Sequence, residues 1–553
     1  MKTMLTLSAA LLSVSVAQAN PVDEMSQLTI IPNHNPTMIR NFNPYVPSRL
    51  HTARDFIYEP MVVFNELKGN RPEFRLATNY TFSDDLLSLT FDLRQGVEWS
   101  DGKPFTADDV VFTFAMVKEN STIDDRGINA LVDKVIKVDA HTVKFVLSEV
   151  NTNAAYEVVL VPIVPQHIWK DVKNITEFEN TNPVGTGPFT DIALFTPSLY
   201  LQCRNPTYWD RDNLDVDCLR APQFNHNDQV LGSLIDSQVD WAGSFVPDIE
   251  TTFVGASKHH GYWYPAAGTQ AFMFNFTSPD PIKNEVLSNV DFRRAFSMAI
   301  DRQNIVDVAN YGNGTINDFA SGLGYAFEAW SDVETHNEFK PFMTYDINGA
   351  KALLKKAGFI DRNGDGFVQT PSGKSFSLDI QSPNGWTDFN NVVMLAVEQL
   401  ADVGIKANAR TPDFAVYNQN MLNASYDVAY TNYFHGPTPF TYWNSAYHSK
   451  LQTEQGMPRF AMHFWNNAEL DKLLDGFYET ANRDDQLKIA HKIQRIIAEN
   501  QVTVPVMSGS NFYQYNTQRF TGWWTADNQK GRPMIWEGTP ERLLHVLDLK
   551  PTS

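Results

Sequence analysis

The sequence predicts a mixed α/β protein with two or more interleaved lobes, and three observations support this prediction. Strand-like segments with alternating apolar residues and helix-like segments with a longer period follow one another along the whole chain. The chain has 553 residues, which is more than one hydrophobic core usually organises. Hydrophobic residues make up 43% of it and aromatic residues 12%, enough to build cores of that size.

The first 19 residues have the pattern of a secretory signal peptide. Lys2 gives the positive start, residues 4–16 are mostly apolar, and Ala17-Gln18-Ala19 is a small-x-small cleavage site. No later stretch reaches the roughly 18 apolar residues that a transmembrane helix needs, and no cysteine lies near the cleavage site. We therefore expect a soluble protein exported to the periplasm of a Gram-negative cell, without a lipid anchor.

Residues 87–120 predict a strand, turns and a helix. Apolar and polar residues alternate over residues 87–94, as in a half-buried strand, and two glycine-containing turn signals follow. Thr106 then precedes Asp109 by three residues, which is typical of a helix N-cap with an acid in the first turn. None of these residues carries out chemistry.

The chain has two cysteines, Cys203 and Cys218. They flank a turn-rich segment between two extended ones, and an exported protein meets an oxidising compartment. A disulfide that closes a hairpin is therefore predicted, contributing roughly 3 kcal/mol. A two-thiol metal site is the weaker alternative, because no histidine with ligand spacing lies nearby.

The net charge and the absence of known catalytic motifs exclude several classes of function. The formal net charge is −20 at pH 7, and a surface of this sign repels phosphate backbones, so no nucleic-acid partner is expected. We find no G-x-S-x-G, H-E-x-x-H or Walker motif, and carboxylates are too numerous for one acid–base pair to be singled out. The sequence predicts no enzyme and no cofactor, with a glycan hydrolase as the enzymatic alternative.

One loop begins like a calcium-binding EF-hand. Asp361, Asn363 and Asp365 take its first three ligand positions, but Ser372 stands where a bidentate glutamate is needed. The 13 histidines are scattered, and the adjacent side chains of His259-His260 do not converge on one metal. We predict a tight polar turn and no metal site, with calcium as the weaker alternative.

Several segments resemble one known family. Residues 87–120 are similar to the signature of the family 5 extracellular solute-binding proteins, which serve ABC importers of peptides and some oligosaccharides. This resemblance implies a two-lobed periplasmic binding protein fold (cluster C, peptide-receptor-like) with an extra subdomain in the first lobe. Further similar segments are residues 182–189, 205–209, 291–302, 350–358 and 400–406.

The resemblance also implies how the chain is divided. In this family the chain crosses twice between the lobes, so the first lobe is built from separate pieces. The expected parts are residues 1–19 as the signal peptide, 20–68, 181–270 and 512–553 in the first lobe, 69–180 as its extra subdomain, and 271–511 as the second lobe.

Three aromatic residues stand in polar loops where a core residue would be unexpected. Trp386 follows the predicted strand 376–380, Phe434 follows the predicted strand 427–430, and Trp536 lies near the C-terminus. Loops that leave strand ends bind ligands in open α/β sheets. Because an aromatic face stacks well on the apolar face of a sugar ring, these three residues are candidate ligand contacts.

Asn432 departs from the pattern that the resemblance implies for peptide receptors. In those members an aspartate in the corresponding loop pairs with the terminal amine of the peptide. An amide donates and accepts hydrogen bonds, but it gives no Coulombic attraction to an ammonium group. This difference favours a neutral ligand, and an oligopeptide or dipeptide receptor of the same family remains the alternative.

Within the family, the nearest resemblance is to the chitin-oligosaccharide receptors of marine bacteria, which bind β-1,4-linked N-acetylglucosamine oligomers. It implies delivery of the sugar to an ABC transporter permease and contact with a membrane sensor histidine kinase, and we expect a monomer. The ligand contacts that it implies are the stacking residues Trp386, Phe434 and Trp536 and the polar residues Asn227, Asp388 and Asn432.

Overall fold

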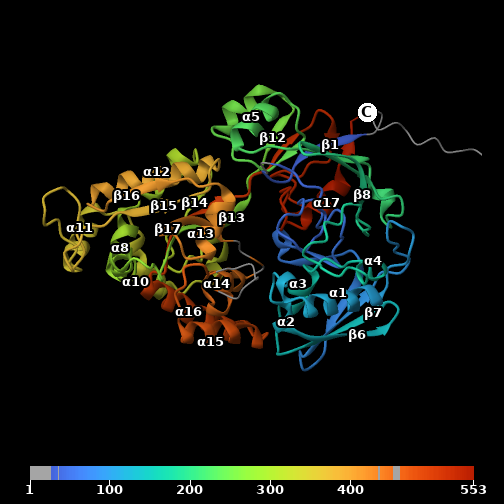
Figure 1. The fold of residues 1–553 in the computed structure, drawn as a ribbon, viewed down its shortest axis with the longest axis horizontal. Helices are drawn as coiled ribbons and strands as arrows, with labels where there is room; N and C mark the ends of the chain where they lie inside the picture. Colours follow the sequence, from blue (N-terminus) through green and yellow to red (C-terminus); the bar gives the residue numbers. More distant parts are fainter. Residues whose placement is uncertain (1–25, 35–36, 434–435, 437, 453–460, 553) are drawn as a thin grey trace, which may run out of the picture.

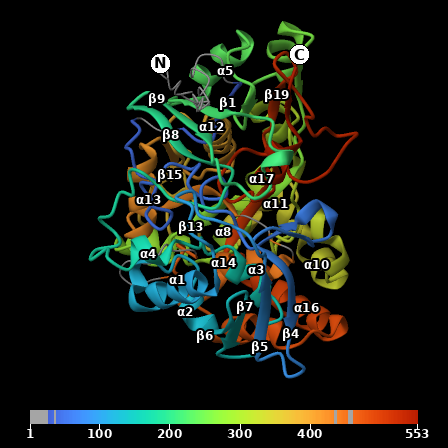
Figure 2. The same ribbon diagram turned by 90° about the vertical axis from the view of Figure 1, so that its right-hand side faces the viewer.

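The computed structural model describes residues 26–552 apart from 35–36, 434–435, 437 and 453–460. The predicted signal peptide and Phe434 lie outside the described residues. Figure 1 shows two lobes side by side, and Figure 2 shows the molecule turned by 90°. Each lobe has a main β-sheet of its own.

The first lobe is built on a seven-stranded sheet in the order β12-β19-β11-β1-β10-β9-β8. β1 runs parallel to β10 and β11, and the other neighbours are antiparallel. Because β19 pairs with β11 and β12, the C-terminal part of the chain returns to this lobe. Its elements are β1 (Gln27–Ile31), β8 (Phe189–Thr196), β9 (Leu199–Arg204), β10 (Cys218–Pro222), α5 (Asn227–Ile235), β11 (Trp241–Ala242), α6 (Ile249–Thr252), β12 (His260–Tyr262), β19 (Gln514–Asn516), β20 (Phe520–Thr521), α17 (Glu541–Asp548) and β21 (Lys550–Pro551).

The extra sheet of this lobe has four antiparallel strands in the order β4-β5-β7-β6. It confirms the predicted strand and helix. Leu89 and Phe91 of β5 are fully buried, and the Thr106 side chain accepts a hydrogen bond at the start of α1 while Asp109 accepts one from the Thr106 amide. The elements around it are β2 (Val62–Asn65), β3 (Arg71–Phe74), β4 (Ala77–Phe82), β5 (Ser88–Leu93), α1 (Ala107–Glu119), α2 (Ile128–Leu131), β6 (Val132–Asp139), β7 (Thr142–Leu147), α3 (Ala154–Val159) and α4 (Gln166–Trp169).

The second lobe is built on a six-stranded sheet in the order β14-β18-β13-β17-β15-β16. Successive residues of β13 alternate between two cores: Phe272 packs on one face of the sheet and Met273 on the other. Helices therefore cover both faces, as in other buried sheets. The elements are β13 (Ala266–Phe274), α7 (Pro281–Leu287), α8 (Val290–Ala299), α9 (Arg302–Asn304), β14 (Thr315–Ile316), α10 (Val333–Met343), α11 (Ile347–Lys356), β15 (Leu378–Gln381), α12 (Thr387–Asp402), β16 (Ala407–Arg410), α13 (Phe414–Leu422), β17 (Val428–Tyr433), α14 (Pro439–Tyr447), α15 (Ala468–Gly476), α16 (Arg483–Asn500) and β18 (Thr503–Ser510).

The chain crosses between the two main sheets twice, from β12 to β13 and from β18 to β19. The crossing segments are hydrogen-bonded to each other. The Asn511 amide N–H donates to Pro265 O at 2.8 Å, and the Trp263 amide N–H donates to Tyr513 O at 3.1 Å. The two connections therefore lie side by side and can act together as a hinge. The predicted limits of the lobes remain predictions, and the one after residue 270 falls inside β13.

The segment at residues 291–302 has a structural role in the second lobe. Arg293 donates to the carbonyl oxygens of Gln501, Leu287 and Asn500. Arg302 donates to the carbonyls of Pro505, Ser297 and Met343, among others. Both guanidinium groups are buried, and burial lowers the pKa of Arg293 to about 9 and that of Arg302 to about 10. These arginines join α8 and its flanks to the chain around β18.

The loop that begins like an EF-hand forms the predicted polar turn. Both Asp361 carboxylate oxygens accept backbone hydrogen bonds, from the amides of Gly364 and Gly366. Asp365 accepts one from the Phe367 amide. The carboxylates thus hold the turn itself, and Gly364 and Gly366 take the positive φ angles that it requires.

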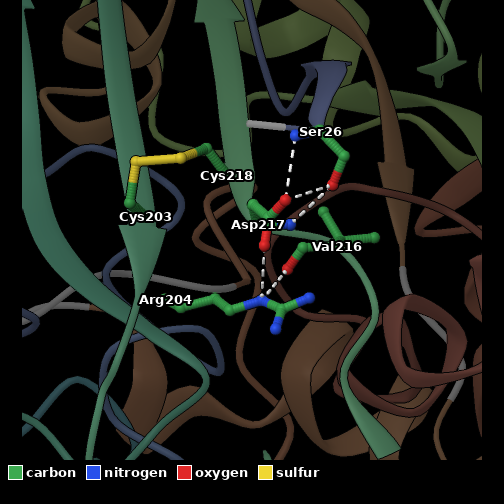
Figure 3. Close-up of a disulfide and its surroundings, with 6 residues drawn as sticks. All are labelled: Ser26, Cys203, Arg204, Val216, Asp217 and Cys218. Carbon is green, nitrogen blue, oxygen red and sulfur yellow. Dashed lines mark hydrogen bonds and ion pairs between the residues drawn. A yellow bond between two sulfur atoms is a disulfide. The ribbon is translucent and has the colours of Figure 1, made fainter. Parts of the chain in front are cut away.

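The predicted disulfide between Cys203 and Cys218 is confirmed. The two residues are directly opposite each other on β9 and β10, with a Cα–Cα distance of 4.0 Å. Figure 3 shows hydrogen bonds beside it that join β9 and β10 to the start of β1. The Ser26 amide donates to Asp217 Oδ2 at 2.9 Å, and Arg204 Nε donates to Val216 O at 2.8 Å.

Replacing Cys203 and Cys218 by serine is expected to lower the free energy of unfolding by about 2 kcal/mol, the low end of the usual range for a disulfide. The loss is modest because the β9–β10 ladder and the contacts of Asp217 still hold the hairpin together. Urea denaturation of the variant and of the oxidised parent measures the difference. An unchanged midpoint would show that the bond contributes no stability.

Candidate ligand-binding site

The predicted site residues of the second lobe lie at one edge of its sheet. β15 and β17 are parallel, so the loop with Trp386 and the residue Asn432 both lie at their carboxyl ends. β13 begins at this edge, and its register places Gln270 opposite Asn432. Two side-chain amides therefore stand on neighbouring strands close to the Trp386 loop. The carboxyl ends of strands are where such sheets bind ligands.

Trp386 is partly buried and held by aromatic neighbours. Phe414 stacks on it with ring centroids 5.3 Å apart and an interplanar angle of 21°, and Phe389 meets it edge-on at 5.2 Å. Gly385, directly before it, has a φ of +79°, a conformation that a residue with a side chain rarely takes. The loop thus turns sharply, and Trp386 forms the N-cap of α12.

Asp388 lies in the first turn of α12 and is almost fully buried. Burial raises its pKa to about 6, and hydrogen bonds from the backbone amides of Phe389 and Asp388 oppose that rise. Burial, and after it the charge of Asp388, raise the pKa of Tyr430 well above its usual value. The Tyr430 hydroxyl donates to Gln270 Oε1 at 2.8 Å. A polar cluster therefore runs from Asp388 to the amide of Gln270.

Asn227 comes from the first lobe and reaches the same place. It is the first residue of α5, and its Nδ2 donates to Thr387 Oγ1 at 3.3 Å. The preceding His226 packs on Gly385, where an added Cβ would lie 2.1 Å from Nδ1 of the imidazole. The structure therefore brings Asn227 together with the Trp386–Asp388 segment, across the junction of the lobes.

A second contact joins the lobes far from α5. The Thr152 amide N–H, just before α3, donates to Tyr478 O at 3.1 Å. Near the crossing segments, the rings of Phe245 and Tyr311 lie 6.3 Å apart. The lobes thus meet at both ends of their junction.

Trp536 belongs to the first lobe. Its indole N–H donates to Gly243 O at 2.7 Å, and its ring meets Phe512 edge-on with centroids 6.1 Å apart. An added Cβ at Gly243 would lie 2.4 Å from Trp536 Nε1, so only glycine leaves room for the indole here. Among the residues that the structure describes, Trp536 makes no ring contact with Trp386.

The structure also shows neighbours that the sequence analysis missed. Gln270 lies opposite Asn432, and Phe414 stacks on Trp386. The Tyr430 hydroxyl donates to Gln270. The continuous apolar run at residues 271–274 could have indicated β13, but not its pairing with β17. Phe434 lies outside the described residues, so its place in the site stays a prediction.

A hollow of about 620 Å³ lies elsewhere, at the start of β1. None of the predicted site residues line it. Arg519 lines this hollow and forms an ion pair with the buried carboxylate of Asp240, with 2.6 Å between Arg519 Nη2 and Asp240 Oδ2. Within the described part of the chain, no cluster of three or more potential metal-ligating side chains is found. No helix there is long and apolar enough to cross a membrane.

Comparison with known proteins identifies the family. Residues 71–453 match the family model of the bacterial extracellular solute-binding proteins, family 5 Middle. The chain belongs to this family. It is thus a solute-binding protein of the kind that serves ABC transporters. This family 5 protein has the two-lobed α/β fold of periplasmic binding proteins, as predicted.

Similar proteins differ in what their names say they bind. The oligopeptide-binding protein AppA of Bacillus subtilis is 25% identical, over 82% of this chain and 83% of its own. The periplasmic alpha-galactoside-binding protein of Rhizobium meliloti is 24% identical, over 57% of this chain and 50% of its own. A mannohexaose-bound periplasmic oligopeptide-binding protein of Thermotoga maritima has the same fold, with a TM-score of 0.88 and 24% identity, covering 96% of this chain and 99% of that one.

Proposed function

We propose that this family 5 protein captures chitooligosaccharides, the β-1,4-linked oligomers of N-acetylglucosamine, and delivers them to an ABC importer. The proposal goes one step beyond family membership, since it names the ligand. It rests on the residues at the junction of the lobes, where aromatic rings and neutral amides lie together.

The observation that carries the proposal is the pair of amides on neighbouring strands beside an indole. Asn432 and Gln270 are opposite each other, and Trp386 leaves the same edge of the sheet. Amides hydrogen-bond to hydroxyl and acetamido groups, and an indole stacks on the apolar face of a sugar ring. A neutral, ring-containing ligand with many hydroxyl groups matches this set.

Closure of the lobes supplies the mechanism. Trp386 belongs to the second lobe, while Trp536 and Asn227 belong to the first, so a ligand that touches all three favours the closed arrangement. A ligand shifts an open–closed equilibrium only by its differential affinity for the two forms. The paired crossing segments are the natural hinge. The moving parts are the second lobe, residues 271–511, and the first lobe, residues 20–270 and 512–553.

The proposal extends to location and partners. The protein acts in the periplasm after removal of residues 1–19, as a monomer that binds its ligand and does not alter it. The closed, liganded form docks on the permease of the importer. It also contacts a membrane sensor histidine kinase, which then reports the presence of chitin fragments.

An uptake assay tests the proposed function. Deletion of the gene is expected to abolish uptake of labelled di-N-acetylchitobiose and to leave uptake of free N-acetylglucosamine unchanged. A plasmid copy of the gene restores uptake, whereas a copy carrying Trp386→Ala does not. Normal chitobiose uptake together with lost tripeptide uptake would overturn the proposal.

A peptide receptor is the second candidate, and two observations favour it. AppA, 25% identical, is named an oligopeptide-binding protein, and Asp388 offers a carboxylate to a peptide amine. A peptide receptor binds tripeptides and not chitooligosaccharides, and a chitooligosaccharide receptor does the reverse. Parallel titrations with tripeptides and with chitotriose therefore distinguish the two candidates.

Replacing Gly243 by alanine is expected to weaken chitooligosaccharide binding about tenfold, the effect of losing one well-packed ring. The new methyl group occupies the place of the Trp536 indole and displaces it. Calorimetric titration measures the change. Gly232→Ala, on α5 with open space around the added Cβ, is the matched control and is expected to bind normally. Normal binding by Gly243→Ala would mean that Trp536 is not a ligand contact.

A further inference from the structure

Trp386 is the first member of a row of three aromatic rings. Phe414 stacks on Trp386, and Tyr417 follows Phe414 with centroids 6.4 Å apart and planes inclined by 19°. The Tyr417 hydroxyl donates to Tyr430 O at 2.8 Å. The row is therefore anchored to β17, the strand that carries the predicted contact Asn432.

The loop before Trp386 is also tied to the start of α13, the helix that carries Phe414. The Asn384 amide N–H donates to Pro412 O at 2.8 Å, and Asn384 Nδ2 donates to Asp413 Oδ1 at 3.3 Å. One backbone and one side-chain hydrogen bond from Asn384 thus hold the loop before Trp386 beside the start of the helix that carries Phe414.

Phe414 itself is not a core residue, because 49% of its surface is exposed. A ring left half in water contributes much less to folding than a buried one. The ring nevertheless covers one face of Trp386, so a sugar ring can stack on the indole only from the opposite face. Phe389 also packs against the indole, with the two ring planes inclined by 80°.

We propose that Phe414 is a positioning residue that holds the Trp386 indole in the orientation required for stacking on a sugar ring. The inference rests on the proposed function, in which Trp386 contacts the ligand. Phe414 acts through Trp386 and does not touch the sugar. Its effect on affinity therefore depends on the presence of the indole.

Fluorine NMR of protein labelled with 5-fluorotryptophan tests the contact without any ligand. Trp386→Phe identifies the Trp386 signal among those of the 12 tryptophans. Phe414→Leu, which keeps an apolar side chain but removes the ring, is expected to shift that signal. Phe414→Tyr leaves it in place, and so does the control Val416→Ala, on the same helix and 51% exposed. An unmoved Trp386 signal in Phe414→Leu would overturn the proposal.

Titration with N,N′,N″-triacetylchitotriose tests the consequence. Phe414→Leu is expected to weaken binding about fivefold, as for one aromatic stacking contact, and Phe414→Tyr to restore it. In a Trp386→Ala background, Phe414→Leu adds no further loss, because the two residues act as a unit. An additional fivefold loss in that background would contradict the proposal. A parent protein that does not bind chitotriose overturns the proposed function instead, and the fluorine signal still decides whether Phe414 holds Trp386.

Discussion

Replacing Trp386 and Trp536 together by alanine is expected to weaken binding of the N-acetylglucosamine tetramer by roughly 30- to 1,000-fold. Each well-packed ring contributes roughly 1 to 2 kcal/mol by analogy with other aromatic contacts, and every 1.4 kcal/mol is a factor of ten. The two indoles belong to different lobes, so the double variant also loses the preference for the closed form. Calorimetric titration of parent and variant measures the change.

The fold of the double variant should remain intact, because both indoles are only partly buried. Tyr345→Ala is the control for loss of an aromatic ring at the surface, since Tyr345 is 44% exposed in the second lobe. It is expected to bind the tetramer as the parent does. Parent-like binding by the double variant would show that the two tryptophans are packing residues.

Asp388→Asn is expected to stabilise the protein by about 3 kcal/mol at pH 7.5 and at the same time to weaken sugar binding roughly tenfold. Burial raises the pKa of Asp388 from 3.8 to about 6, so folding disfavours the charged carboxylate. The resulting penalty is absent below pH 3.8, grows between pH 3.8 and 6, and is complete above pH 6. The asparagine amide carries no charge, so the substitution removes this penalty in stability. A sugar hydroxyl that donates to Asp388 loses a charged acceptor in the variant.

Urea denaturation at pH 4 and at pH 7.5 tests the first half of this prediction. The variant should exceed the parent in stability at pH 7.5 and differ from it by less than about 1 kcal/mol at pH 4. Replacing a residue that contacts the ligand at a cost in stability is expected to raise stability and weaken binding together. A variant less stable than the parent at pH 7.5 would mean that Asp388 serves to cap α12.

Local patterns in the sequence predicted the parts of the fold that depend on nearby residues. The strand and capped helix around Thr106 form as expected because their hydrogen bonds connect residues a few positions apart. The disulfide followed from two cysteines on either side of one hairpin. The family resemblance, spread over the whole chain, predicted the two-lobed fold that the comparison confirms.

The neighbours of the site residues could not be predicted from the sequence, because they come from segments that are far apart along the chain. Gln270 and Tyr430 are 160 positions apart, and only the pairing of β13 with β17 brings them together. Gly243 and Trp536 are 293 positions apart. Phe414 carries no signal of its own, since an aromatic residue at the start of a helix is usually a packing residue. Asn227 was expected at the ligand, and the structure adds that its amide bonds to Thr387 across the lobes.

Calorimetric titration of the mature protein with N-acetylglucosamine dimer, trimer and tetramer tests the central claim most directly, with cello-oligomers and tripeptides as controls. We predict heat from the chitin series alone, with affinity little changed by salt. The acetamido group separates the chitin series from the cello-oligomers, because both share the β-1,4 linkage. Heat from tripeptides and none from any sugar would contradict the account and establish a peptide receptor.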